Sequence, residues 1–492
     1  MGPRSLSILP VLLGGCSLIY NAGDLPPPSD ALEFDAPFDS NPELLDITGT
    51  TPSSLDEGVG SGGGRPAIIT LNGTAIVGAA QVSVELIGST EPATLVGFDA
   101  VPDGSKGGVI VRIPVMTDLA AGATRALRIT ITQGSVTRMA DVTINGRDEL
   151  RLSAASANAN TLAPLYSTIE VASDISFTGT EPVKLRATAG AVVNMRLAGD
   201  AVGASGGPHG CNGGGVDNMG QCPGGGGGQG ANGSALGLGT GSGGGGGGFG
   251  ATATTGSGGM AGMGGPASGN DMLVPIDTTA GASGNRGNGG GGGGGGTLQA
   301  GGPGGGGGGV VLLEAGGDIT VGVMGALRVQ GGAGAGNGGS GGGGSGGALL
   351  VRSGGAITST TRWLSAPAGA GGTGANAGGA GSVGRIRVDA AAGDIGAMAN
   401  TPNAVRGPAW GAAVPSLTTT SPLTVEFRGQ PGRSFDLRVN DQPAGTAMPG
   451  VNGDVDLEVT LRPGRNRLCG VAQSGMLIAE SLSCVDLFYA GN

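Results

Sequence analysis

Carboxylates and arginines gather between residues 310 and 400, where they could act together on a polymer. Acid–base catalysis on a sugar chain needs two carboxyl groups at a defined separation, with a basic group that holds the substrate. The carboxylates available for this role are Asp318, Asp389 and Asp394. The arginines near them are Arg328, Arg352, Arg362, Arg385 and Arg387. A charged strand exterior is more often only solvated, so we predict no catalytic residues and expect these charges on a wet surface.

The cysteines offer either metal ligation or disulfide bonding. His209 stands two residues before Cys211 in PHGCNGGGVDNMGQC, which also holds Asp217 and Cys222, so four potential zinc ligands share one loop. The pairs Cys211 with Cys222, and Cys469 with Cys484, are each close in sequence, and in an oxidising compartment they predict two short-loop disulfides. We prefer the disulfides and predict no metal site. His209 also lacks a partner serine in a G-x-S-x-G turn, so it is not predicted to be a catalytic base.

Other ligand motifs are weak. With 113 glycines the chain contains many G-x-G-x-x-G matches, but a dinucleotide site needs a strand before and a helix after the motif. The sequence shows no long amphipathic helix and no G-K-[ST] ending, so we predict no nucleotide and no other cofactor. GNDML (269–273) resembles one turn of the calcium-binding nonapeptide repeat without a second copy, and we expect a plain loop. Trp363 and Trp410 could stack on a sugar ring, but we expect them to be packed inside.

The first residues, MGPRSLSILPVLLGGC, predict an export signal over 1–15. Leu13-Gly14-Gly15-Cys16 resembles the bacterial lipobox, which implies that Cys16 is lipidated and becomes the mature N-terminus. By the sorting rule of that family, Ser17 after the cysteine implies the outer membrane, surface-exposed or facing the periplasm. The lipid would then be the contact with the membrane. The alternative is an ordinary signal peptide that happens to contain a cysteine.

An acidic, proline-rich tether is expected over residues 16–45, because like charges and prolines favour an extended chain. Residues 46–147 then alternate in short β-branched runs with turn clusters between them, which predicts a β-sandwich. The order ITGTTPSSLDEGVGSGG, ITLNGTAI and ITQGSVTRMADVTING resembles the IPT/TIG immunoglobulin-like family. That resemblance implies a fold and no catalytic residues.

Residues 150–400 contain a repeat. VVLLEAGGDIT (310–320), ALLVRSGGAIT (348–358) and RIRVDAAAGDI (385–395) superpose, so that Ile319, Ile357 and Ile395 lie 38 residues apart. VKLRATAGAVV (183–193) fits the same template. Stacked strands with this period predict a right-handed parallel β-helix.

The predicted inner columns of this repeat are apolar, and the alternate columns are charged. The columns expected to face the core are Val310/Ala348/Ile386 and Leu312/Leu350/Val388, together with Val183 and Leu185. The alternate positions Lys184, Arg186, Arg387 and Asp389 are expected to be wet.

Glycine blocks at 331–347 and 368–384 are expected to be loops that leave the stack or pack beside it, and 204–309 is a larger glycine-rich insertion. Collagen is excluded because the triplet of the triple helix is missing. Two possibilities remain open. The insertion is either a disordered low-complexity loop or a set of extended glycine helices that hydrogen-bond to one another, which resembles the polyglycine-II bundles of some phage tail tips and antifreeze proteins.

Residues 420–492 alternate again, as in VDLEVTL (455–461), and predict a C-terminal immunoglobulin-like sandwich. The expected fold class is therefore all-β. The net charge of −11 argues against nucleic acid as a partner. As a whole, the chain resembles multidomain surface lipoproteins of myxobacteria, which implies a structural or adhesive role toward polysaccharide, matrix or cells. The alternatives are a β-helix carbohydrate-active enzyme or carbohydrate-binding protein, and an envelope scaffold protein.

Overall fold

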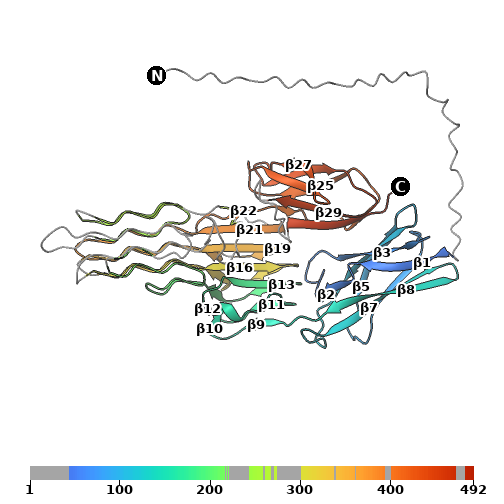
Figure 1. Ribbon diagram of the computed structural model, residues 1–492, viewed down its shortest axis with the longest axis horizontal. Coiled ribbons are helices and arrows are strands. Elements are labelled where there is room, and N and C mark those ends of the chain that lie inside the picture. The colour runs from blue at the N-terminus through green and yellow to red at the C-terminus, as the bar shows by residue number, and fades with distance from the viewer. Residues whose placement is uncertain are drawn as a thin grey trace, which may run out of the picture. The chain divides into compact units, whose positions relative to one another are not determined.

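The computed structural model describes residues 44–216, 218, 220, 243–258, 261–267, 271–273, 301–336, 339–360, 362–393, 401–471 and 483–491. The signal, Cys16 and nearly all of the predicted tether lie outside these ranges. Within them the chain is all-β: six sheets and a 3-10 turn at Ala159–Thr161, with no α-helix (Figure 1). None of the segments described is a helix long and apolar enough to cross a membrane.

The first module is a pair of four-stranded sheets around one core. One sheet contains β1 (Asp46–Thr51), β3 (Ala67–Thr74), β6 (Lys106–Arg112) and β5 (Thr94–Ala100). The other contains β2 (Ser54–Asp56), β8 (Val136–Asn145), β7 (Thr124–Gln133) and β4 (Gln81–Leu86). Strict alternation along β7 sends Leu127, Ile129 and Ile131 inward, each fully buried. The pairs are antiparallel except β2 with β8.

The second module stacks short parallel strands in three columns, so that each turn of chain lies on the previous one. The first column is β13 (Val183–Ala187), β16 (Val310–Ala315), β19 (Ala348–Ser359), β21 (Arg385–Ala392) and β22 (Val405–Arg406). The second is β9 (Leu150–Leu152), β11 (Ile169–Val171), β14 (Ala191–Val193), β17 (Ile319–Val321) and the end of β19. The third is β10 (Ser156–Asn158), β12 (Ile175–Thr178), β15 (Arg196–Ala198), β18 (Ala326–Arg328) and β20 (Leu364–Ser365).

The repeat is real, but its predicted register is wrong in two copies. Ile319 pairs with Ile357 as expected, whereas Ala348 pairs with Arg385 and Val183 pairs with Val311. A slip of one residue moves a side chain to the other face of a strand. VVLL and ALLV are apolar on both faces, so their pattern could not distinguish the two registers.

Because of this slip, the side chains of β16 and β19 that fill the core are not the ones predicted to do so. Val311, Leu313, Leu349 and Val351 point into the main core, where Ile386 and Val388 join them. Val310, Leu312, Ala348 and Leu350 point to the opposite face, where another part of the chain covers them.

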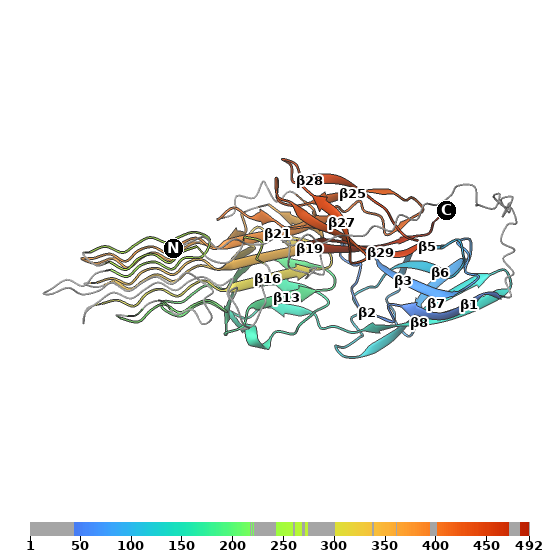
Figure 2. The ribbon, with the colours of Figure 1, turned by 45° about the horizontal axis from the view of Figure 1, so that its top comes forward.

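All three glycine-rich excursions leave the stack at the same corner. They run from the end of a third-column strand to the start of the next first-column strand: β15 to β16, β18 to β19 and β20 to β21. Since those strands are stacked in register, the excursions also begin and end one above another. Figures 1 and 2 show them as thin wavy traces running side by side beyond β16, β19 and β21.

The third module is again two sheets around one core. One contains β23 (Ala409–Trp410), β25 (Leu423–Arg428) and β28 (Asp454–Val459). The other contains β24 (Leu417–Thr418), β30 (Cys484–Tyr489), β29 (Gly464–Val471), β26 (Phe435–Val439) and β27 (Gln442–Ala447). Trp410, Phe427 and Phe435 meet edge to face in the core, with centroids 5.2 and 5.5 Å apart.

Glu57 helps to fasten the first module to the stack. Its backbone carbonyl accepts the Thr188 hydroxyl at 2.6 Å, and its buried carboxylate accepts the backbone N–H groups of Met116 and Arg147. Desolvation raises the pKa of Glu57 above its ordinary value, and the two backbone N–H groups oppose that rise only in part.

This raised pKa predicts a specific pH dependence. The folded protein holds the Glu57 proton more tightly than the unfolded chain, so this group's contribution to stability is fully present below the unfolded pKa of 4.5 and is lost as the pH rises through the folded pKa. Glu57→Gln removes the titration. The difference in free energy of unfolding, wild type minus E57Q, should therefore be more favourable to the wild type at pH 4 than at pH 7, by denaturant titration at both values. An equal difference at both pH values would contradict the assignment.

Candidate binding surface

The glycine-rich excursions form a packed body, here called the glycine bundle. It comprises the described residues 203–215, 243–258, 261–267, 301–309, 329–336, 339–347 and 366–384. Its segments are held by hydrogen bonds between backbones, with every third amide as donor. The amides of Gly302, Gly305 and Gly308 each donate at 2.8 Å to carbonyls that are likewise three residues apart in segment 339–347.

This spacing has a clear physical origin. A polyproline-II chain repeats every three residues and makes no hydrogen bonds within itself, so all its N–H and C=O groups are available to neighbours. Segment 339–347 donates on one side to 376–384 and on another to 329–336, again at every third residue. Its carbonyls accept from 243–250, 301–309 and 369–372. The bundle thus satisfies its backbone without forming strands.

Segment 339–347 is the centre of the bundle and is buried along its whole length. At Gly344 an added Cβ would lie against the backbone carbonyl of Gly306, and at Gly341 it would lie against that of Pro303. Both approaches are well inside van der Waals contact. Glycine is therefore required at these positions by the close approach of the neighbouring chains.

The outer face of the bundle is uncharged and carries hydroxyl groups. The described bundle contains no Asp, Glu, Lys or Arg. Thr252 and Thr255, three residues apart, are exposed, as are Thr254 and Ser257. The last two hydroxyls donate to carbonyls of segment 376–384 at 3.1 and 3.2 Å, which holds them against the neighbouring chain.

An apolar cluster connects the bundle to the stack. Phe249 and Leu273, both fully buried, cover Val310, Leu312 and Leu350 on the side of β16 and β19 away from the main core. The Arg385 guanidinium lies over the Phe249 ring, 5.4 Å from its centroid. This part of the large insertion therefore covers the outer apolar face of β16 and β19, which would otherwise be exposed to solvent.

The charged columns predicted to be wet are buried in the upper turns. One column reads Arg186, Glu314, Arg352 and Asp389 in register, with alternating sign. Arg387 is 0% exposed and Asp389 3%. Arg387 donates to both Asp389 oxygens and, at 2.7 Å, to the Met272 carbonyl. In the lowest turn, Lys184 and Arg186 remain half-buried.

The expectation of solvated charges was wrong for Arg387 and Asp389 because two other parts of the chain cover them. The Met272 carbonyl accepts from Arg387, and Gly407 lies against both side chains. Arg352 reaches Asp389 at 3.2 Å and Glu314 at 3.9 Å, and Arg186 reaches Glu314 at 3.6 Å. Two acids and three arginines therefore do converge. They form a closed ionic cluster and not an open cleft, and a polymer has no path to it. Burying charge at this density is tolerated because each partner is paired.

The remaining charged candidates do not join this cluster. Asp318 lies at the junction with the first module, where its amide donates to the Gly62 carbonyl at 2.6 Å. Arg328 pairs with Asp200, and Arg362 is exposed. Asp394 lies outside the described residues.

The residues considered for metal binding and for stacking on a sugar are His209, Cys211 and the two tryptophans. His209 has a positive φ of 64° and is half-buried next to Cys211, which is disulfide-bonded. Cys222 and Asp217 lie outside the described ranges, and among described residues no group of three metal-ligating side chains comes together. Trp363 and Trp410 are 1% and 2% exposed, so packing holds both.

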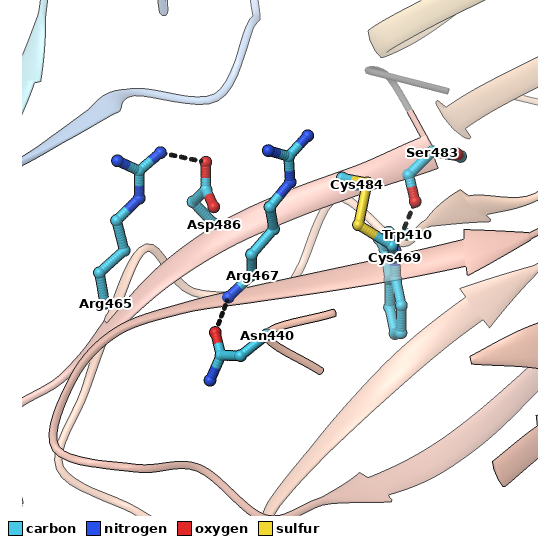
Figure 3. The surroundings of a disulfide bond; sticks show 8 residues. All are labelled: Trp410, Asn440, Arg465, Arg467, Cys469, Ser483, Cys484 and Asp486. Carbon is cyan, nitrogen blue, oxygen red and sulfur yellow. Dashed lines mark hydrogen bonds and ion pairs between the residues drawn. A yellow bond between two sulfur atoms is a disulfide. The ribbon is translucent and has the colours of Figure 1, made fainter. Parts of the chain in front are cut away.

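Cys469 and Cys484 face each other on β29 and β30 and are disulfide-bonded (Figure 3). The neighbouring backbone is held by Trp410, whose indole N–H donates to the Ser483 carbonyl at 3.0 Å. Farther along the same strands, Arg465 pairs with Asp486 at 2.7 Å (Figure 3). The disulfide thus closes the sheet beside the Trp410 core.

Comparisons of this chain with protein-family models, curated proteins and solved structures gave no match.

Substituting a central glycine should open the bundle. Gly344→Ala drives a methyl group into the Gly306 carbonyl, and overpacking of this kind costs about 1–3 kcal/mol. Hydrogen exchange of segment 339–347 should accelerate accordingly. The matched control is Gly215→Ala, whose new Cβ meets nothing closer than the Asn218 side chain at 3.5 Å. Equal protection in both variants would show that close packing does not hold the bundle.

Breaking the ionic cluster should destabilise the stack. Arg387→Met leaves the buried Asp389 carboxylate short of a partner, and removing one member of a buried pair costs roughly 3–5 kcal/mol. Denaturant unfolding followed by tryptophan fluorescence measures this loss. Arg128→Ala is the control, because its ion pair with Asp141 is exposed and exposed pairs contribute about 0–1 kcal/mol. Similar losses in the two variants would refute the role given to the cluster.

Proposed function

We propose that this protein is a lipid-anchored surface protein of the bacterial outer membrane that adheres to a polymer or matrix through its glycine bundle. Cys16 carries the lipid, and residues 16–45 are the tether. The first and third modules are immunoglobulin-like sandwiches, the first of IPT/TIG type. The stacked strands are a right-handed parallel β-helix, and the bundle is of polyglycine-II type.

The observation that carries the proposal is the bundle's outer face. A broad surface without charge, with exposed threonines held by a rigid backbone network, loses little conformational entropy or charge hydration when it meets another neutral surface. Such a face suits a neutral, hydroxyl-bearing polymer that is itself extended and ordered. Many weak contacts along that polymer add up through multivalency. The closed ionic cluster favours this adhesive role over turnover.

The test uses the soluble fragment that follows Cys16 and a set of insoluble neutral polysaccharides and matrix preparations. The double variant Thr252→Glu/Thr255→Glu places two charges on the exposed face, where a neutral polymer would have to desolvate them. The double variant should weaken pull-down by tenfold or more, because leaving a desolvated polar group without a partner costs on the order of 1–3 kcal/mol. It should not shift the unfolding midpoint.

The control is Thr94→Glu/Thr143→Glu, which adds the same charge at exposed threonines of the first module. This variant should bind as the wild type does. If the wild-type fragment binds none of the polymers, or if the two double variants behave alike, the glycine-bundle hypothesis fails. The anchor is tested separately: Cys16→Ala in the full chain should release the protein from the membrane fraction.

A further inference from the structure

A second candidate site lies away from the glycine bundle, where the first module meets the stack. A cavity of about 560 Å³ is lined by the loop that contains Gly63 and Arg65, by Arg112 of β6, and by Asp318 and segment 354–356 of the stack. Its charged lining side chains are Arg65, Arg112 and Asp318; the rest of the wall is mostly glycine and small apolar side chains. Its volume is in the range of small-molecule sites.

Arg112 is oriented by its surroundings but is not neutralised. Its Nη1 donates to the carbonyls of Gly60 and, at 2.7 Å, of Gly64. In the part of the chain that the structure describes, its Nε and Nη2 donors have no acceptor and no acid pairs with it. The Nε–Nη2 edge of a guanidinium matches the two oxygens of a carboxylate.

Arg65 adds a second positive charge to the same wall. Its guanidinium donates to the backbone carbonyls of Val414 at 2.9 Å, Trp410 at 3.2 Å and Gly411. Burial lowers the pKa of Arg65 to about 10, so it stays protonated at neutral pH. Carbonyl dipoles, and no carboxylate among the described residues, hold this charge.

Asp318 supplies an acceptor. Its Oδ1 accepts the Ala356 amide at 2.7 Å, and its Oδ2 receives no donor from the described residues. Gly63 and Gly355 lie so close that a Cβ on either would strike the carboxylate. Glycine at both positions therefore makes room for the Asp318 carboxylate, which is half-buried and lines the cavity.

These groups define the chemistry of an occupant. Two arginines and one aspartate give the cavity a net charge of +1, which favours an anion over a zwitterion such as a free amino acid. The open guanidinium edge fits a carboxylate, and the open Asp318 oxygen fits a hydroxyl. A sugar acid carries both groups on one ring.

Two neighbouring cavities share lining residues with it. A cavity of about 540 Å³ shares Asp318 with it and also contains Glu170 and Thr320. Another of about 280 Å³ shares Arg65 and Gly354. A row of adjacent cavities suits several linked rings better than one. We propose that this junction cleft binds a uronate-containing oligosaccharide, its carboxylate on Arg112 and its hydroxyls on Asp318.

The experiment titrates the soluble fragment with oligogalacturonate, with a neutral oligosaccharide of equal length, and with tetraglutamate, by calorimetry. Wild type should bind oligogalacturonate in preference to the other two, more weakly at high salt. Arg112→Lys keeps the charge but loses the two parallel N–H donors of the guanidinium, and should weaken binding roughly ten- to hundredfold. Asp318→Asn should also weaken it, because its Oδ1 can still accept the Ala356 amide while the charged acceptor for hydroxyls is gone.

A variant pair guards against misfolding as the cause. Ala412 is exposed and lines the cavity, so Ala412→Trp should block binding while Arg65, Arg112 and Asp318 stay unchanged. Ala413→Trp, at the next exposed position outside the lining, should bind like the wild type. No binding of oligogalacturonate, a preference for tetraglutamate, or equal effects of the two tryptophans would overturn the proposal. T252E/T255E should leave this binding intact, so the failure of one site can be told from that of the other.

Discussion

The close approach of backbones in the glycine bundle is the constraint on which the rest of the molecule depends. Chains that exchange hydrogen bonds at 2.8–3.0 Å in several directions at once leave no room for a Cβ at residues 341–344, 346 and 347. The ordering of so many glycines is entropically costly. It is offset only if nearly every amide and carbonyl finds a partner and if the ends of each excursion are already fixed in space.

The stack of parallel strands supplies those fixed ends. Each excursion begins after a third-column strand and returns to a first-column strand, so the stacking of strands sets the spacing of the glycine chains. The large insertion in turn protects the stack, since Phe249 and Leu273 cover the second apolar face of β16 and β19. Residues 271–273 also help to close the ionic cluster around Arg387 and Asp389. Scaffold and bundle are therefore one cooperative body in energetic terms.

The two proposed sites use this body differently. The bundle offers a neutral, repeating face suited to many weak contacts, whereas the junction cleft concentrates two arginines and one aspartate around a cavity. The bundle would bind a surface through a large contact area, and the junction cleft would select its ligand by charge. Both depend on glycine: in the bundle so that chains can touch, and in the cleft so that the Asp318 carboxylate has room beside Gly63 and Gly355.

The sequence by itself determined the all-β class, several strands of the first and third modules, the 38-residue interval between Ile319 and Ile357, and the departure of glycine loops from a stacked core. These follow from period-two alternation and repeat length, which are local properties. It could not determine which face of VVLL and ALLV points inward, because both faces are apolar and a one-residue slip exchanges them.

Burial of Arg387 and Asp389 was likewise decided by tertiary structure. Met272, whose carbonyl accepts from Arg387, lies more than a hundred positions earlier in the chain, and no local pattern connects the two. The cleft that unites Arg112 with Asp318 arises in the same way, from modules that meet only after folding. The hydrogen bonds between glycine segments could not be predicted either. A glycine run has no side-chain pattern that indicates which segment it will pair with.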